Sequence, residues 1–169
     1  MKPLLIVDGY NVIGAWKDAA KYAWSIDESR DRLMHQLMDY GGYTGEEVVL
    51  VFDGYQSDKR TTTQEQHGML TLVFTKHGET ADSYIERYVA QLPKYRIARV
   101  ATSDGVEQAM VLGSGATRMT SRELLRELKQ MRQAGFDAHS RPAIYSKNSL
   151  AARLPADVQE ALERLRRGQ

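Results

Sequence analysis

Three short, mostly apolar runs of this chain each lead into an aspartate, and this repeated pattern constrains the fold most. Residues 4–7 precede Asp8-Gly9, residues 48–52 precede Asp53-Gly54, and residues 97–102 precede Ser103-Asp104-Gly105. Runs without polar alternation are typical of parallel strands that are buried on both faces. Open α/β sheets bind ligands at the carboxyl ends of such strands. One Asp-Gly pair alone is an ordinary turn, in which the glycine permits the tight bend, but its recurrence predicts a shared site.

The other elements alternate with these strands. Capping boxes at 25–28 and 120–123 predict helices that end at Gly41-Gly42 and Gly135, and a third amphipathic helix follows Asp82 and ends at Pro93. Further strands are predicted at 69–74 and 116–119, a short helix near 110–115 and a last helix from Pro155. Residues 12–24 are predicted as a loop with a short helical turn, and residues 55–68 as a loop. Near alternation of strand and helix implies parallel strands with right-handed crossovers.

Length and composition exclude several classes of protein. A chain of 169 residues favours one domain with a proper core. It has no cysteine, so any metal is expected to bind carboxylate, histidine or water. The first strand begins too early to leave room for a signal peptide, and no apolar run approaches the roughly 20 residues of a membrane span. We therefore expect a cytoplasmic protein without a membrane partner.

Charge is unevenly distributed along the chain. Residues 1–58 contain five Lys/Arg and ten Asp/Glu, whereas residues 113–169 contain eleven and six, and the formal net charge is +1. An acidic end that holds cations and a basic end that meets phosphates suit a nucleic-acid enzyme, although simple segregation of charge gives the same count. The small net charge argues against autonomous RNA binding by bulk electrostatics. We expect another particle to present the substrate.

Carboxylates gathered at one sheet edge would repel one another, and a divalent cation resolves that conflict. Oxygen ligands favour Mg²⁺ or Mn²⁺, which can activate water and polarise a phosphodiester. Glu79 and Asp82 lie three apart at a helix start, where plain helix capping is the alternative explanation. We predict Asp8, Asp82 and Asp104 as metal ligands. Asp53 and Glu79 are predicted as further catalytic acids, in the roles of ligand, outer partner or group that orients water.

Other chemistries fit the residues less well. Phosphatases that form an aspartyl-phosphate usually need an acid two residues after the first-strand aspartate, where this chain has Tyr10. The glycine patterns of dinucleotide and phosphate-loop sites are absent, so no nucleotide cofactor is expected. The four histidines show no His-x-x-x-His pair, and only His77 is kept as a minor site candidate. Asn11 is positioned to hydrogen-bond Asp8 or a substrate phosphate, although a turn asparagine needs no such role.

The motifs together resemble a known family. Residues 5–13 (LIVDGYNVI), 51–54 (VFDG), 74–86 (FTKHGETADSYIE) and 102–104 (TSD) resemble the NYN domain of YacP-like proteins, a branch of the PIN-like nucleases. The resemblance covers about residues 3 to 165. It implies a single-domain, three-layer α/β fold over residues 1–169 with a central parallel sheet in the order 3-2-1-4-5 flanked by helices. The basic tail and the helix predicted from Pro155 occupy about residues 136–169.

The resemblance also implies a function. Similar proteins are ribosome-associated endoribonucleases that cut mRNA in the ribosomal A site, with an acidic constellation that falls here on Asp8, Asp53, Asp82 and Asp104, alongside Glu79. Many PIN-like nucleases have a further acid after the fourth-strand aspartate, and this chain has Glu107. We therefore expect a metal-dependent endoribonuclease whose partners are mRNA and the rRNA of the ribosome. The alternatives are a non-catalytic ribosome- or RNA-binding factor with a vestigial acidic site, and a small-molecule phosphohydrolase.

Phosphate contacts are predicted from cations that lie in predicted loops and not on helix faces. At least half of them are expected to be ordinary solvated charges. Besides Asn11, the predicted substrate-binding residues are Lys59, Arg60, Lys76, Arg141, Lys147 and Arg153.

Overall fold

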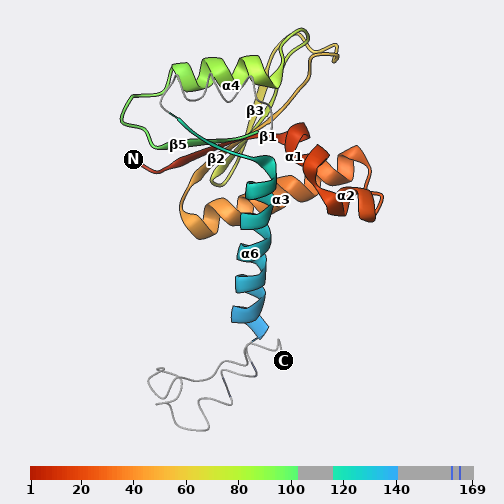
Figure 1. Ribbon diagram of the computed structural model, residues 1–169, viewed down its shortest axis with the longest axis vertical. Coiled ribbons are helices and arrows are strands. Elements are labelled where there is room, and N and C mark those ends of the chain that lie inside the picture. The colour runs from red at the N-terminus through yellow and green to blue at the C-terminus, as the bar shows by residue number, and fades with distance from the viewer. Residues whose placement is uncertain (103–115, 141–160, 162–163, 165–169) are drawn as a thin grey trace. The chain divides into compact units, whose positions relative to one another are not determined.

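The computed structural model describes residues 1–102, 116–140, 161 and 164. By their contacts the residues form two units, Met1–Met131 and Arg132–Gln169, and the first contains the sheet (Figure 1). The short helix expected near 110–115 and the last helix expected from Pro155 fall largely outside the described residues. The expectation of a single domain over residues 1–169 stays a prediction.

A six-stranded sheet in the order β3-β4-β2-β1-β5-β6 forms the centre of the first unit. All neighbouring strands are parallel except the pair β3 and β4. The five strands expected from the sequence are β1, β2, β4, β5 and β6, so the predicted parallel order 3-2-1-4-5 is confirmed. The strands are β1 (Leu4–Asp8), β2 (Glu47–Phe52), β3 (Thr63–His67), β4 (Leu70–Phe74), β5 (Ala98–Ala101) and β6 (Thr117–Met119).

Strand β3 lies where the sequence predicted a loop, and that prediction was wrong. The strand is polar throughout and largely exposed, so it has no hydrophobic pattern from which it could be recognised. It pairs with β4 in an antiparallel hairpin whose turn contains Gly68 at φ 60°. Backbone pairing with β4 at the sheet edge, and not burial of side chains, holds this strand in place.

Helices differ from the sequence predictions mainly at their ends. Two short helices occupy most of the segment 12–24, where a loop with one short helical turn was predicted. The box at Ser25 does start a helix, but this helix continues through Gly41-Gly42 to a left-handed cap at Gly45. The last described helix likewise passes Gly135. The helices are α1 (Gly9–Ala15), α2 (Lys17–Lys21), α3 (Ile26–Thr44), α4 (Ala81–Ala90) and α6 (Ser121–Ser140).

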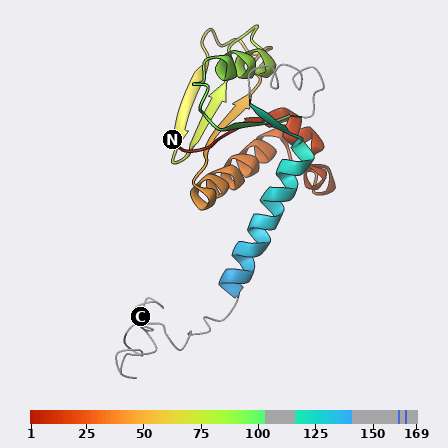
Figure 2. The same cartoon turned by 60° about the vertical axis from the view of Figure 1, so that its left-hand side comes forward.

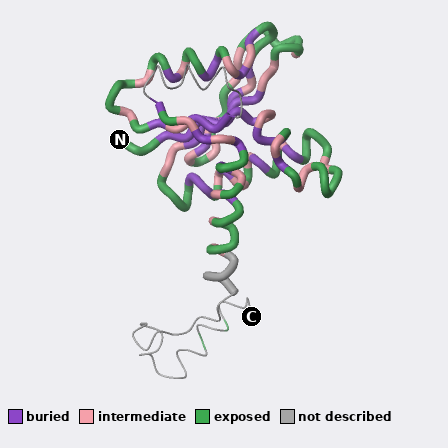
Figure 3. Tube along the Cα trace, in the orientation of Figure 1, coloured by how far each residue is buried: buried purple, intermediate pink, exposed green. Residues whose placement is uncertain are grey.

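The two faces of the sheet bury separate hydrophobic clusters, because alternate residues of a strand point to opposite sides. Leu5 and Val7 pack with residues of α1, α3 and α6, whereas Leu4 and Ile6 pack with residues of α4. Figures 1 and 2 show α4 and α3 on opposite faces, and in Figure 3 the buried backbone is concentrated in the central strands. By the same alternation Asp8 belongs to the α4 face.

Within the part of the chain that the structure describes, no helix has both the length and the apolar character needed to cross a membrane.

Candidate functional site

Asp8 is the last residue of β1 and also caps the helix that follows. Its Oδ1 accepts a hydrogen bond from the backbone N–H of Asn11 at 3.3 Å, so the ordinary capping role holds. Only 7% of its surface is exposed, however, so this carboxyl group is more deeply buried than helix capping alone requires. Gly9, in the first turn of α1, lies against the ring of Phe52, and a Cβ at this position would overlap that ring. Close packing, not a left-handed turn, therefore explains the glycine after Asp8.

Asp82 meets Asp8 from the start of α4. The two side chains share a hydrogen bond, and the charge of Asp53 lies close enough to act on Asp8. Burial is the largest cause that raises the pKa of Asp8, from 3.8 to about 6, and the neighbouring carboxylates Asp82 and Asp53 raise it further, against the opposing N–H of Asn11. The structure thus brings together three acids that are far apart in the sequence.

Asp53 holds the end of β2 to the start of α4. Its Oδ1 accepts from the backbone N–H of Tyr55 at 2.7 Å, and its Oδ2 accepts from the N–H of Ala81 at 3.2 Å. The next residue is tightly packed, since a Cβ at Gly54 would overlap the carbonyl oxygen of Thr75. Because both carboxylate oxygens already bind backbone amides, Asp53 fixes the helix that carries Asp82. Asp53 therefore anchors the start of α4, and its predicted catalytic role stays a prediction.

Glu79 is buried, with 8% of its side chain exposed, and its Oε1 accepts from Arg87 at 3.1 Å. Thr75 fixes the backbone here, because its hydroxyl donates to the carbonyl of Glu79 at 2.7 Å and accepts from the N–H of Gly54 at 2.8 Å. Thr80 then caps α4 by accepting from the N–H of Ser83. Glu79 is therefore engaged in an ion pair, and its predicted catalytic role stays a prediction.

Five of the residues singled out from the sequence cannot be placed. Asp104 and the neighbouring Glu107, together with the predicted phosphate contacts Arg141, Lys147 and Arg153, lie outside the described residues. Strand β5 does run beside β1, with Ala101 opposite Val7. The third predicted metal ligand is thus untested.

The described carboxylates fit a divalent cation in chemistry but do not complete its ligand set. Asp8 and Asp82 meet at the sheet edge, and the raised pKa of Asp8 reflects the conflict that a hard cation relieves. The side chains described in residues 1–102 and 116–135 include no group of three His, Asp or Glu arranged to hold a metal. Asp8 and Asp82 would be the ligands from this part of the chain.

A cavity of about 480 Å³ opens next to Asp53 and was not predicted from the sequence. Its aromatic wall is continuous: Phe52 lies 5.0 Å from Tyr10 and 5.5 Å from Phe74 between ring centroids. We call this the aromatic cavity. Its lining residues are Tyr10, Asp27, Arg30, Asp31, Met34, Phe52, Asp53, Gly54, Ser57, Lys59, Leu72, Phe74 and Thr75.

Polar groups are placed around this aromatic wall. Arg30 donates to the Tyr10 hydroxyl at 3.2 Å and also pairs with Asp27, and Lys59 lies 5.7 Å from the centre of the Phe74 ring. The Ser57 hydroxyl is buried and has no hydrogen-bond partner among the described residues. No sequence signal could have identified this cavity, because its wall is made of residues that look like core.

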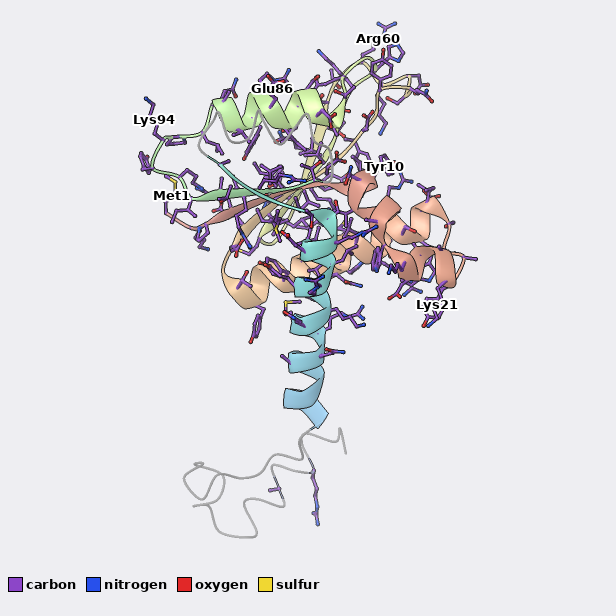
Figure 4. All side chains as sticks on the ribbon, in the orientation of Figure 1. Met1, Tyr10, Lys21, Arg60, Glu86 and Lys94 are labelled. Atoms are coloured by element: carbon purple, nitrogen blue, oxygen red, sulfur yellow. The ribbon has the colours of Figure 1, made fainter. Side chains whose placement is uncertain are left out.

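The remaining predicted contacts are distributed differently. All three placed cations are exposed. Lys59 also lines the aromatic cavity, and Arg60 lies at the outer end of the segment before β3 (Figure 4). The Oδ1 of Asn11 accepts from the Ser121 hydroxyl at 2.7 Å and so joins α1 to α6. His77 bonds to the carbonyl of Ser57, which fits a loop role.

The comparisons with known proteins cover nearly the whole chain. A family model described as the YacP-like NYN domain matches residues 5–167. The chain is 36% identical over 167 residues to the uncharacterized protein YacP of Bacillus subtilis (strain 168), covering 98% of this chain and 97% of that protein.

Solved structures show the same likeness. The crystal structure of Rae1 (YacP) from Bacillus subtilis matches with a TM-score of 0.67 and 35% identity, covering 99% of this chain and 96% of that one. The crystal structure of a mutant of the same Bacillus protein matches with a TM-score of 0.68 and 32% identity, covering 95% of this chain and 98% of that one.

Proposed function

We propose, from the premise that this chain belongs to the YacP-like NYN domain family of the PIN-like nuclease superfamily, that it is a cytoplasmic, metal-dependent endoribonuclease. Its proposed substrate is single-stranded mRNA, and the proposed place of cleavage is the A site of translating ribosomes. Nuclease character in general follows from the family. The metal, the RNA substrate and the ribosome are the proposal.

One observation carries the proposal: Asp8 and Asp82, from different elements, share a hydrogen bond at the carboxyl end of the central strand, where Asp8 has a raised pKa. A protein gains no stability from burying two acids against each other. Such an arrangement is typical of a site that completes its charge balance only with a ligand. A phosphodiester with a divalent cation supplies that balance.

The residues of this chain divide the work. Asp8 and Asp82 would hold Mg²⁺ or Mn²⁺, which when bound supplies an activated water and stabilises charge on the phosphate. Asp53 orients Asp82 by anchoring the first N–H of α4. In the aromatic cavity, Phe74 and Tyr10 offer ring faces to a base, a contact that tolerates any sequence. Lys59 and Arg30 place positive charge next to it.

The ribosome enters the proposal through charge. The formal net charge is only +1, and the first 58 residues, which contain Asp8 and Asp53, have ten Asp/Glu against five Lys/Arg. RNA would therefore be repelled from this end of the chain unless something else holds it in place. A translating ribosome presents single-stranded mRNA at high local concentration, which removes the need for tight autonomous binding.

The test is to map the 5′ ends of mRNA in a translating extract with the unsubstituted protein, Asp8→Asn or Asp82→Asn. Each substitution is expected to lower cleavage by roughly 100-fold or more, because both carboxylates are needed for the cation. Glu86→Gln is the matched control, since Glu86 is an exposed acid one turn after Asp82 on α4 (Figure 4). Cleavage that persists in both aspartate variants would refute the mechanism.

A second function is favoured by the engaged acids. Asp53 binds two backbone amides and Glu79 binds Arg87, so both can be explained as structural groups. A non-catalytic ribosome- or RNA-binding factor would retain these contacts. It is distinguished by normal association with ribosomes without any new 5′ ends, and by melting that does not respond to Mg²⁺ or Mn²⁺.

A further inference from the structure

A second cavity of about 480 Å³ lies beside Asn11, and it shares no lining residue with the aromatic cavity among the residues that the structure describes. We call it the arginine cavity. It is formed where α1, the end of β6 and the start of α6 meet, and its lining residues are Asn11, Gly14, Ala15, Arg118, Thr120 and Arg122.

The ionisable groups in this lining are both arginines. No carboxylate of the described residues lines the cavity, whereas Asp27, Asp31 and Asp53 line the aromatic cavity. Neither Arg118 nor Arg122 forms an ion pair within the described part of the chain. The adjacent acid Glu123 is already used, because its Oε2 accepts from the backbone N–H of Thr120 in the capping box. The cavity therefore has an uncompensated positive lining over these residues.

Arg118 also has an unused donor. Its Nε is buried and has no hydrogen-bond partner among the described residues. A guanidinium offers its N–H groups as a planar fork that matches the oxygens of a phosphate. The first turn of α6 lies at the same cavity through Thr120 and Arg122, and a helix N-terminus favours negative charge. A phosphate oxygen in the cavity would satisfy the buried donor and the charge together.

Small residues keep the cavity open. Asn11, Gly14 and Ala15 lie on one face of α1, and a Cβ added at Gly14 would meet no atom within 4 Å. Asn11 also connects the cavity to the acids, because its backbone N–H donates to Asp8 and its side chain accepts from Ser121. Asn11, which lines the arginine cavity, is thus directly hydrogen-bonded to Asp8 of the carboxylate pair.

We propose that the arginine cavity binds a backbone phosphate of the RNA strand, next to the phosphodiester that is cut. The proposal rests on the endoribonuclease function and adds to it the anchor that an acidic centre lacks. Carboxylates at the cleavage point repel the strand, so a separate cationic site must hold a neighbouring phosphate. Two arginines with no ion-pair partner among the side chains that the structure describes meet that need.

Binding can be measured apart from cleavage in the Asp8→Asn background. The probe is a fluorescein-labelled, single-stranded RNA of about 12 nucleotides, and its affinity is measured by anisotropy from about 20 mM salt upward. Arg118→Gln with Arg122→Gln is expected to weaken binding about tenfold and to reduce the slope of log affinity against log salt by about 1.4, or about 0.7 for each lost contact. Arg126→Gln with Lys129→Gln is the control, because it also removes two positive charges and both residues are exposed further along α6.

A second variant tests the cavity without changing charge. Gly14→Leu fills the open space and is expected to weaken RNA binding at least about fivefold, as a blocked phosphate site should. Gly42→Leu is its matched control, because Gly42 is also helical and a Cβ there meets nothing within 4 Å. Circular dichroism and melting establish that each variant folds, and inorganic phosphate should compete with RNA only where the cavity is intact.

The outcomes separate the two proposals. Cleavage by the unsubstituted protein, with RNA affinity and salt slope unchanged in the double variant and in Gly14→Leu, overturns the phosphate site alone. Weakened binding in those variants, without cleavage by the unsubstituted protein, supports the site and overturns the nuclease. No measurable RNA binding at about 20 mM salt by the Asp8→Asn protein with its cavity intact also overturns the site.

Discussion

The two ends of the central strands carry polar clusters of opposite kinds. At the amino ends, Arg99 donates to Glu46 at 2.9 Å, to the Tyr40 hydroxyl at 2.7 Å and to Glu127 at 3.3 Å. At the carboxyl ends, Asp8 faces Asp82 and the charge of Asp53. Both clusters are at least partly buried. In the first cluster the positive charge of Arg99 balances the nearby acids. The second cluster consists of acids.

The pKa values show the same contrast. Burial raises the pKa of Tyr40 to about 12, so its hydroxyl remains a neutral donor and acceptor inside a paired network. Burial raises the pKa of Asp8 to about 6, which places a change of charge near physiological pH. In a cluster that stabilises the fold, the charges and hydrogen bonds are paired within the protein. In a cluster that binds a ligand, part of the charge is balanced only when the ligand is bound.

The largest expected effect is stabilisation by Asp8→Asn. A buried carboxyl whose pKa rises from 3.8 to about 6 costs almost nothing below about pH 4, where it is protonated in both states, and costs the full amount above about pH 6. The shift corresponds to roughly 3 kcal/mol. Asp8→Asn should therefore raise the free energy of unfolding at about pH 7.5 by up to that amount, and leave it nearly unchanged at about pH 4, in denaturant titrations with chelator. A loss of stability at the higher pH would contradict the contrast.

Arg99→Met should have the opposite effect and lower the free energy of unfolding. It leaves Glu46 and the Tyr40 hydroxyl without their cation in a partly buried place, and removing one partner of such a pair costs about 2 kcal/mol after allowance for solvent. We expect a corresponding loss in the free energy of unfolding, with RNA cleavage preserved in the protein that remains folded. Lys129→Met, an exposed lysine of α6, is the control and should change little.

Divalent cations should stabilise the protein by binding at the carboxyl ends of the central strands, at Asp8 and Asp82. At about ten times the dissociation constant, bound Mn²⁺ or Mg²⁺ adds about 1.4 kcal/mol to the free energy of unfolding. The melting temperature of the unsubstituted protein should rise with added cation at about pH 7.5 and much less at about pH 5, where protons compete for Asp8. Arg99→Met should respond in the same way as the unsubstituted protein. An equal rise in Asp8→Asn would place the cation elsewhere.

The smallest effect is expected for Arg87→Met. Glu79 is buried and Arg87 is 55% exposed, so loss of the arginine should destabilise the fold by about 1 kcal/mol. Such a loss, with cleavage reduced less than in Asp82→Asn, would assign Glu79 to the structural kind of cluster. Cleavage that falls as far as in Asp82→Asn would return Glu79 to the catalytic kind. Lys94→Met, an exposed lysine after α4, is the control.

The sequence revealed the fold where local chemistry and tertiary position coincide. Buried runs that lead to Asp8 and Asp53 correctly predicted parallel strands, because such strands have no other stable place than the middle of a covered sheet. The order of the strands was implied by the resemblance to the family. The capping boxes correctly placed the starts of α3 and α6, because a helix cap is formed by residues close together in the sequence. Glycines misled the predicted helix ends, because Gly41 and Gly135 both lie inside helices that continue past them.

The candidate site was predictable in its residue types but not in its division of roles. Alternation along β1 and β2 puts Asp8 and Asp53 on the face that α4 covers, so their meeting with Asp82 could be anticipated. That Asp53 binds the backbone of Tyr55 and Ala81 could not, since it depends on where a loop closes. Neither cavity has a sequence signature, because aromatic walls read as core and single arginines read as surface.

The ring of Phe52 belongs at once to the hydrophobic core and to the wall of the aromatic cavity. Whatever enters that space rests directly on the packing that keeps the chain folded. Binding of a ligand in the aromatic cavity should therefore raise the melting temperature, even for a single nucleoside that undergoes no reaction. A thermal-shift screen of the common ribonucleosides would read out which base the protein prefers before any cleavage assay exists.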